Sequence, residues 1–326
     1  MIPQNPLLKV SNLKLFYPSE YGPVWAANNV SLEVREKEVV GVVGESGCGK
    51  STLAFTIMRL NPTAKIVSGE IVFKGRNLLK LSTKEMEKIR GREISLIFQN
   101  PTTFLNPVMK IKRQLMEILL RHFPSLTKEE AISKITQTLR LVGLDARVLE
   151  NYPFELSGGM LQRIMIVMML LPEPSLLIAD EPTSALDVTV QMQVLNLLKN
   201  IQKSVGISIL LITHDFGIVA DICDRVYVMY AGRVVETADV YSLYEKPMHP
   251  YTAGLLNSLL RIDEYKEILP MLPGEVPDLT QLPQGCVFHP RCSYSKDVCL
   301  KREPPLVDIG SERKVACWLY SSLEGE

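Results

Sequence analysis

The sequence predicts an α/β protein with an antiparallel β region at its front and a helical insertion in its middle. Short apolar, β-branched runs recur along the chain and are separated by helical stretches, a pattern typical of parallel strands joined by crossover helices. Residues 7–35 alternate apolar and polar positions, which indicates antiparallel strands. Between about 110 and 171 helical periodicity dominates. Together these patterns place antiparallel strands, a parallel sheet and a helical region in one fold.

The elements follow in chain order. Four buried strands are predicted, at 38–43, 175–179, 207–213 and 225–230. A hairpin-like stretch at 69–78 extends the antiparallel region, and Pro124 and Pro153 interrupt the helical part. The strand at 38–43 opens directly into a glycine-rich turn, so we expect a loop and then a helix after it.

Composition limits the classes of function. The chain has 326 residues, of which 46% are hydrophobic, so it can bury a substantial core. Lys and Arg total 36, as do Asp and Glu, which gives a formal net charge of zero. A protein dedicated to nucleic acid usually carries a basic excess. We therefore expect no nucleic-acid partner.

The apolar runs are short. The longest covers residues 164–171, eight residues, whereas a transmembrane helix needs about 20. The first twelve residues lack the basic stretch and long apolar core of a secretory signal. We expect the chain to lie in the cytoplasm, with other subunits holding it if it acts at a membrane.

The first chemical motif is a phosphate loop that fits G-x-x-x-x-G-K-[ST]. Its expected ATP-binding residues are Gly44, Glu45, Ser46, Gly47, Cys48, Gly49, Lys50, Ser51 and Thr52. Glycines let successive backbone N–H groups face phosphate oxygens, and the following helix directs its positive end at the same anion. Lys50 is expected to reach the β- and γ-phosphates, and the Ser51 hydroxyl to ligate Mg²⁺.

The second motif is a pair of acids, Asp180 and Glu181, at the end of a buried strand. Ligands of open α/β sheets bind at the carboxyl ends of the strands. Asp180 is expected to hold Mg²⁺, directly or through water, and Glu181 to orient or deprotonate the attacking water. His214, after the next strand, is expected to contact the γ-phosphate, and Gln99 the metal or the water.

At this point the motifs resemble ATP-binding-cassette (ABC) proteins over about residues 7–260. Residues 156–163, LSGGMLQR, resemble the family signature, and 184–187 resemble the D-loop, with Asp187 as its acid. Gln99 resembles the Q-loop, His214 the H-loop, and Tyr17 the aromatic that stacks on adenine. The resemblance implies a P-loop NTPase ABC nucleotide-binding domain with an antiparallel β subdomain and a helical signature subdomain.

The resemblance also implies a dimer, because the chain has one phosphate loop and one signature. The signature residues would contact ATP bound mainly to the other subunit; they are Ser157, Gly158, Gly159 and Gln162. Leu161 occupies a position where relatives often carry a polar or basic residue. ATP binding would join the two subunits, and hydrolysis would release them.

A narrower resemblance is carried by residues 98–109 and 247–252, which look like the oligopeptide/dipeptide/nickel importer subfamily. It implies an ATPase at the cytoplasmic face of the membrane, paired with a second, homologous ATPase as a heterodimer, two permeases and an external binding protein. Residues 100–125 would pass movement to the permease. Peptide, nickel and oligosaccharide cargoes all stay open, and a soluble ABC ATPase of DNA repair or translation is the alternative.

The tail is rich in Pro and Cys. Its four cysteines, Cys286, Cys292, Cys299 and Cys317, resemble the subfamily's motif for a [4Fe–4S] cluster. Zinc is the second choice, although structural zinc sites favour closer cysteine pairs, and unligated thiols are the third. A tail poor in core residues needs such a staple. The predicted domains are therefore 1–262, the ATPase with its helical subdomain at about 100–172, and 263–326, the Cys-rich extension.

Overall fold

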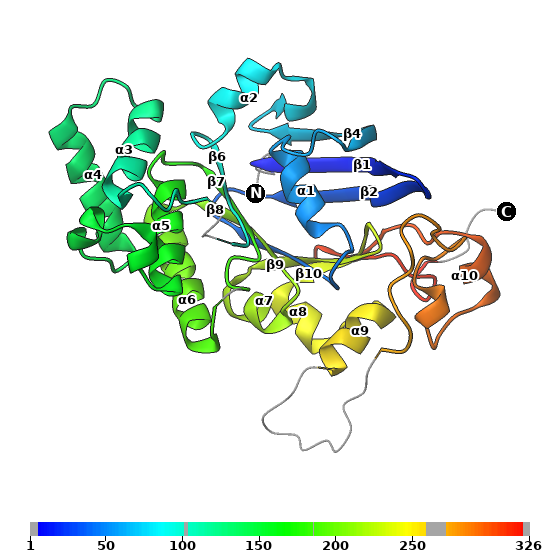
Figure 1. The fold of residues 1–326 in the computed structure, drawn as a ribbon. Coiled ribbons are helices and arrows are strands. Elements are labelled where there is room, and N and C mark those ends of the chain that lie inside the picture. Colours follow the sequence, from blue (N-terminus) through cyan, green and yellow to red (C-terminus); the bar gives the residue numbers. More distant parts are fainter. Residues whose placement is uncertain (1–5, 101–103, 185, 259–271, 322–326) are drawn as a thin grey trace. The chain divides into compact units, whose positions relative to one another are not determined.

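A computed structural model describes residues 6–100, 104–184, 186–258 and 272–321 (Figure 1). The chain divides into two compact units. The first comprises residues up to 33 together with 40–79 and the part from 213 onward, and the second comprises 34–39 and 80–212. Each unit is formed by segments that are distant in the sequence.

The first unit contains an antiparallel sheet in the order β2-β1-β4-β5. Its strands are β1 (Leu8–Ser19), β2 (Gly22–Val34), β4 (Lys65–Phe73) and β5 (Arg76–Asn77). In β1 the buried side chains are Leu8 and Val10 before a break in register, and Leu13 and Leu15 after it. Asn12 takes a left-handed backbone at this bulge, which returns apolar side chains to the core face. The predicted antiparallel region and its hairpin are confirmed.

A second set of strands in this unit has the order β11-β12-β10-β9-β3. The strands are β3 (Val39–Val43), β9 (Arg225–Tyr230), β10 (Arg233–Asp239), β11 (Val307–Gly310) and β12 (Arg313–Val315). β3 pairs in parallel with β9, whereas β9, β10, β12 and β11 pair antiparallel in that order. The tail thus adds β11 and β12 to the sheet that contains β3, the strand before the phosphate loop.

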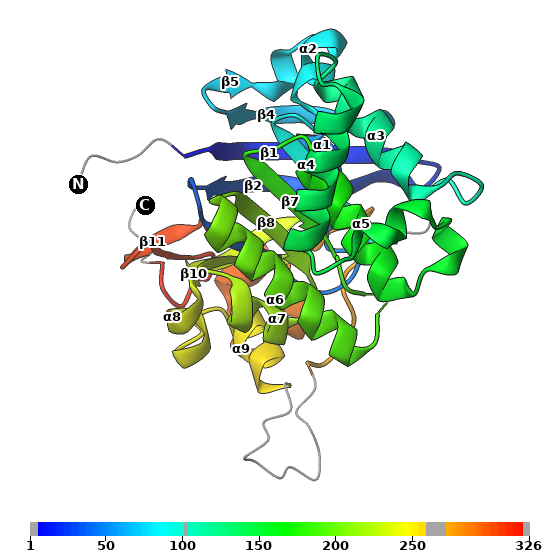
Figure 2. The same cartoon turned by 90° about the vertical axis from the view of Figure 1, so that its left-hand side faces the viewer.

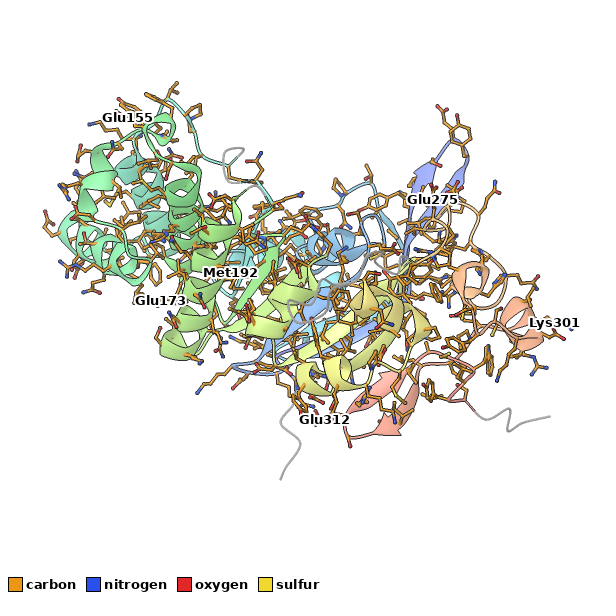
Figure 3. The ribbon with its side chains drawn as sticks, turned by 90° about the horizontal axis from the view of Figure 1, so that it is seen from below. Glu155, Glu173, Met192, Glu275, Lys301 and Glu312 are labelled. Atoms are coloured by element: carbon orange, nitrogen blue, oxygen red, sulfur yellow. The ribbon has the colours of Figure 1, made fainter. Side chains whose placement is uncertain are left out.

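Short helices complete the first unit. They are α1 (Lys50–Ile57), η1 (Leu78–Lys80), α7 (Phe216–Ile222), α8 (Val240–Glu245), α9 (Pro250–Asn257), η5 (His289–Arg291) and α10 (Asp297–Lys301). Lys301 on α10 and Glu312 in the β11–β12 turn lie at the edge of the tail (Figure 3). The tail was expected to be poor in core residues and to depend on something other than a hydrophobic core, yet Val287 and Phe288 are buried in one cluster with Tyr230 and Tyr251.

The second unit has three parallel strands in the order β8-β7-β6. They are β6 (Ile94–Ile97), β7 (Leu176–Asp180) and β8 (Ser208–Thr213), and every residue in them is buried. Burial on both faces explains why they read as continuous apolar runs rather than alternating ones. The strands predicted at 175–179 and 207–213 are confirmed, each starting one residue later.

Helices make up the rest of the second unit, with α3, α4 and α5 packed together (Figure 2). The elements are α2 (Thr83–Ile89), α3 (Ile111–His122), α4 (Lys128–Leu141), η3 (Ala146–Glu150), η4 (Pro153–Glu155), α5 (Gly158–Leu170) and α6 (Val188–Val205). Pro124 lies between α3 and α4, where Thr127 and Glu130 form a capping box that starts α4. The predicted α/β class with a helical region is confirmed.

Some predictions touch residues that the structure does not describe. The boundary between 262 and 263 lies outside the described residues, so the domain limits stay a prediction. Residues 101–103 of the expected movement-relaying segment lie outside them as well. Among the helices that are described, none combines the length and the hydropathy needed to cross a membrane.

Candidate functional site

The phosphate loop joins β3 to α1 inside the first unit, and two of its glycines, Gly44 and Gly49, are required by contact with neighbouring backbone. A Cβ at Gly44 would lie 2.1 Å from the Met229 carbonyl oxygen, and one at Gly49 would lie 1.9 Å from that of Ala26. Gly49 also has φ 102°, which side-chain-bearing residues rarely adopt. Larger residues at these positions would push the loop away from β9 and β2.

Lys50 is the charge at the centre of this loop. Its side chain is buried, and Nζ donates hydrogen bonds to the carbonyl oxygens of Gly44 (2.7 Å) and Glu45 (2.9 Å). Helix α1 carries no acidic residue in its first turn, so no carboxylate of that turn offsets the positive end of its dipole. Burial raises the pKa of the Cys48 thiol, which therefore stays neutral. The loop can accept an anion of high charge density.

The other predicted nucleotide-binding residues of this unit lie on three elements. Tyr17 is on β1 and its hydroxyl accepts a hydrogen bond from Asn61 Nδ2 (3.5 Å). Ser51 and Thr52 are in the first turn of α1, where the Thr52 carbonyl accepts from the Thr56 hydroxyl (2.7 Å). His214 is exposed and follows β8, next to the residue that caps α7.

The second unit holds the two predicted acids. Asp180 is buried as the last residue of β7, whereas Glu181 adopts a left-handed backbone with φ 46°. The Glu181 N–H donates to the Ile212 carbonyl (2.9 Å), and its carboxylate accepts from Gln99 Nε2 (3.0 Å). Non-glycine residues with such backbones cost about 1–3 kcal/mol and gather at functional sites. The structure thus brings together Gln99 and Glu181, which are 82 positions apart in sequence.

The signature begins α5 in the same unit. Ser157 caps the helix by accepting from the Met160 N–H (3.4 Å), as its residue type predicts. Gly159 lies close to α6: a Cβ there would lie 2.7 Å from Val190 Cγ1, so a larger residue would require Val190 to move. Ser157, Gly159 and Val190 are among the residues that line a cleft of about 480 Å³. The helix N-terminus therefore meets a space that can admit a ligand.

The signature also contacts the segment that follows the two acids. Gln162 is buried and its Nε2 donates to the Pro182 carbonyl (2.5 Å). Asp187, the predicted D-loop acid, caps α6 by accepting from the Val190 N–H (3.0 Å). Ala185, in the middle of the D-loop, lies outside the described residues. Gln162 thereby links the signature helix to the turn after Glu181.

Comparison with known proteins finds two families along the chain. Residues 27–184 match the ABC transporter family, and residues 235–299 match the C-terminal region of oligopeptide/dipeptide transporters. A probable peptide ABC transporter ATP-binding protein of Sinorhizobium fredii is 46% identical, with 96% of this chain and 94% of that protein covered. OppD of Salmonella typhimurium, an oligopeptide transport ATP-binding protein, is 44% identical, with 97% and 94% covered.

The chain belongs to the ATP-binding proteins of the oligopeptide/dipeptide ABC transporter family. A probable D,D-dipeptide transport ATP-binding protein of Escherichia coli is likewise 44% identical, with 96% of each chain covered. These relatives are named as transport proteins, so the alternative of a soluble ABC ATPase in DNA repair or translation is not favoured.

Solved ABC structures confirm the fold of this family member. CbiO1 of Clostridium perfringens, described as part of an ABC transporter complex, has a TM-score of 0.65 at 28% identity and covers 74% of this chain and 92% of its own. A dimeric ATP-binding cassette in a post-hydrolysis state bound to ADP and Pi has a TM-score of 0.64 at 27% identity, with 72% and 98% covered. Both matches cover more than two thirds of the chain.

The predicted partner set needs correction. The heterodimer with a second, homologous ATPase, the two permeases and the external binding protein were expected from subfamily resemblance. The relatives above are named only as ATP-binding proteins, and the dimeric neighbour is described as a dimer of a single cassette. None of these comparisons names a second, different ATPase for this chain, so that partner set is not supported.

The iron–sulfur prediction, with zinc as its second choice, is also corrected. The described residues contain no group of three or more His, Cys, Asp or Glu side chains that could hold a metal ion. All four tail cysteines border a cavity of about 10 Å³, which is roughly the space of one water molecule. Burial raises the pKa of the thiols of Cys286, to about 11, and of Cys292 and Cys317, so these groups are neutral. They pack as small apolar side chains.

Sequence reasoning missed the contacts that surround Glu45 in this ABC subunit. Arg291 of the tail and Tyr251 of α9 both hydrogen-bond to this phosphate-loop residue. Tyr251 lies in the 247–252 stretch that carries the subfamily resemblance, and Arg291 immediately precedes Cys292. No spacing rule relates either position to residue 45, because the contacts depend on the tertiary fold.

Proposed function

We propose that this ABC subunit hydrolyses ATP to power a membrane importer of peptides or similar short solutes, working as a peripheral protein at the cytoplasmic face of the membrane. The observation that carries the ATPase part is the phosphate loop, in which neighbouring backbone confines Gly44 and Gly49 and two carbonyls hold the Lys50 ammonium. The peptide part is supported by relatives named for peptide, oligopeptide and D,D-dipeptide transport.

In this proposal the loop binds the phosphates of ATP. Lys50 exchanges its two carbonyl acceptors for oxygens of the β- and γ-phosphates, which compensate its charge more fully. Backbone N–H groups of the loop and the positive end of α1 stabilise the same anion. Tyr17 stacks on the adenine ring.

Three residues would hold Mg²⁺: Ser51, Gln99 and Asp180. They offer hydroxyl, amide and carboxylate oxygens, the ligands that Mg²⁺ prefers, and the buried carboxylate of Asp180 gains from a cation. The bound metal would neutralise charge on the phosphates. Glu181 would accept a proton from the attacking water, and the amide of Gln99 orients its carboxylate. His214 would contact the γ-phosphate.

The start of α5 would bind ATP held by the other cassette of a dimer. Ser157, Gly158 and Gly159 leave space beside a helix N-terminus, and the adjoining cleft of about 480 Å³ suits a phosphate group. Through Gln162 and the Pro182 carbonyl, closure on that nucleotide would reach the turn that follows Glu181. This contact offers a direct path between one ATP site and the hydrolytic residue of the other.

The test is Glu181→Gln, which keeps the size of the side chain and removes the base. We expect ATP turnover to fall by at least about 100-fold while ATP binding is retained. Glu173→Gln is the matched control. Glu173, which is labelled in Figure 3, also has a left-handed backbone and belongs to the second unit, and its ion pair with Lys134 is at the surface. Normal turnover in Glu181→Gln would overturn the proposed mechanism.

The cargo is tested separately, in cells that take up a labelled dipeptide or tetrapeptide through this system. Uptake should cease with Glu181→Gln and persist with Glu173→Gln. If turnover is lost in the first variant but peptide uptake is unchanged, the ATPase assignment survives and the peptide cargo is wrong.

A further inference from the structure

Glu45, the second residue of the phosphate loop, is held through all of its polar groups. Its N–H donates to the Tyr251 hydroxyl (3.0 Å) and its carbonyl accepts from Lys50 Nζ (2.9 Å). Its carboxylate accepts two hydrogen bonds from the guanidinium of Arg291, at 2.8 Å from Nη1 and 3.1 Å from Nη2. One residue therefore connects the tail, α9 and the lysine that faces the nucleotide phosphates.

The position of Arg291 favours this contact. It ends the short helix η5 in the tail, and its side chain is only 5% exposed. Besides Glu45, it donates from Nε to the Pro273 carbonyl (2.8 Å), and Nη1 lies 3.5 Å from the Tyr230 hydroxyl. Bidentate pairs of arginine and carboxylate combine charge with a defined geometry, which lysine cannot reproduce.

The surroundings make the pair rigid. The rings of Tyr230, Tyr251 and Phe288 pack against one another, with centroids 4.6–5.4 Å apart. Tyr251 thus contacts Glu45 with its hydroxyl and the tail with its ring. Because Arg291 is buried, removing the Glu45 carboxylate would leave its positive charge without a partner. The buried ion pair and its hydrogen bonds therefore fix Arg291 and Glu45 in one relative orientation.

We propose that Arg291 is a positioning residue for ATP: by fixing Glu45, the C-terminal extension sets the orientation of the phosphate-loop backbone and of Lys50. This inference rests on the proposed ATPase function. The Glu45 carbonyl is one of the two acceptors of Lys50, so a loop that tilts when Arg291 is lost moves the ammonium as well. Coupling is reciprocal, and bound ATP therefore strengthens the attachment of the extension.

The experiment compares Arg291→Gln, Glu45→Gln and the double variant in the full-length protein, with KM and kcat for ATP and the melting temperature measured for each. Each single variant should raise KM for ATP about tenfold, with kcat changing by less than about threefold. The double variant should raise KM no further than either single variant, because both changes remove one interaction. Arg291→Lys, which keeps the charge and loses the fork, should lie between wild type and Arg291→Gln.

The matched control is Arg225→Gln. Arg225 is another buried arginine of the first unit, with an ion pair to Glu33 on β2 and a hydrogen bond to the Tyr227 hydroxyl. The Arg225→Gln variant should have a lower melting temperature and an unchanged KM for ATP. The inference is overturned if the Arg291 and Glu45 variants lose only thermal stability, as Arg225→Gln does, or if their effects on KM are additive.

A second readout separates this inference from the proposed function. In the wild-type protein, added ATP should protect the C-terminal extension from proteolysis. In the Arg291→Gln variant this protection should be lost. If wild type binds no ATP at all, the proposed function fails. If wild type binds ATP and Arg291→Gln binds it equally well, the function stands and the positioning role is wrong.

Discussion

The phosphate loop and the Cys-rich tail both carry a recognisable sequence motif, yet only the loop has the structure that its motif predicts. Gly44 and Gly49 of the loop are obligatory, because neighbouring backbone lies within 2.1 Å of where a Cβ would be. The cysteines of the tail suggested a metal staple, but the tail is held by Phe288 in the core and by β12 on the sheet. A loop motif specifies backbone conformation locally, whereas a cysteine pattern leaves open what the thiols contact.

The strongest test of the comparison is Gly49→Ala in the loop. The added methyl group would collide with the Ala26 carbonyl and require a strained backbone, so we expect ATP affinity to fall by at least about 100-fold. Equilibrium binding of a fluorescent ATP analogue measures this loss. Gly22→Ala is the control, since Gly22 also has a positive φ but has open space around its would-be Cβ. Equal losses in both variants would show that strain alone, and not the contact, matters.

The tail side of the comparison is tested by Phe288→Ala. Phe288 is 1% exposed and packs on Tyr230 and Tyr251, so its truncation should cost about 3–5 kcal/mol of unfolding free energy in denaturant titrations. Phe154→Ala, at a position 74% exposed, should change stability by less than about 0.5 kcal/mol. An iron chelator should leave the melting temperature of wild type unchanged. A large drop with the chelator, beside a small effect of Phe288→Ala, would reinstate a metal staple.

The smallest expected effect is a change in the pH dependence of stability, and it tests whether the tail is held by a buried core. His249 is fully buried against Phe288, and burial lowers its pKa from about 6.5 to about 3. The unfolded chain therefore binds a proton first, and the stability from neutral His249 is present above pH 6.5 and lost as pH falls toward 3. At pH 5 the loss is about 2 kcal/mol. His249→Asn, whose side-chain oxygen can replace Nδ1 as acceptor for the Tyr251 N–H, should flatten this pH dependence.

Much of the fold was predictable because its patterns are local. Alternating residues marked β1 and β2, continuous apolar runs marked β3, β7, β8 and β9, and Pro124 marked the break between α3 and α4. The tail strands β11 and β12 were not predicted. They are short. β12 is stabilised by pairing with β10, which lies more than 70 residues earlier in the chain, and β11 pairs with β12.

In the candidate site, too, some features follow from local sequence and others from the tertiary structure. The residue types and spacing of the phosphate loop, the signature and the acid pair identified the ABC family, because each motif meets a chemical requirement within a few residues. The tertiary structure alone decided that Gln99 orients Glu181, that Gln162 contacts the Pro182 carbonyl, and that Arg291 holds Glu45. Those partners are 20 to 246 positions apart, and only folding brings their donors and acceptors within hydrogen-bond distance.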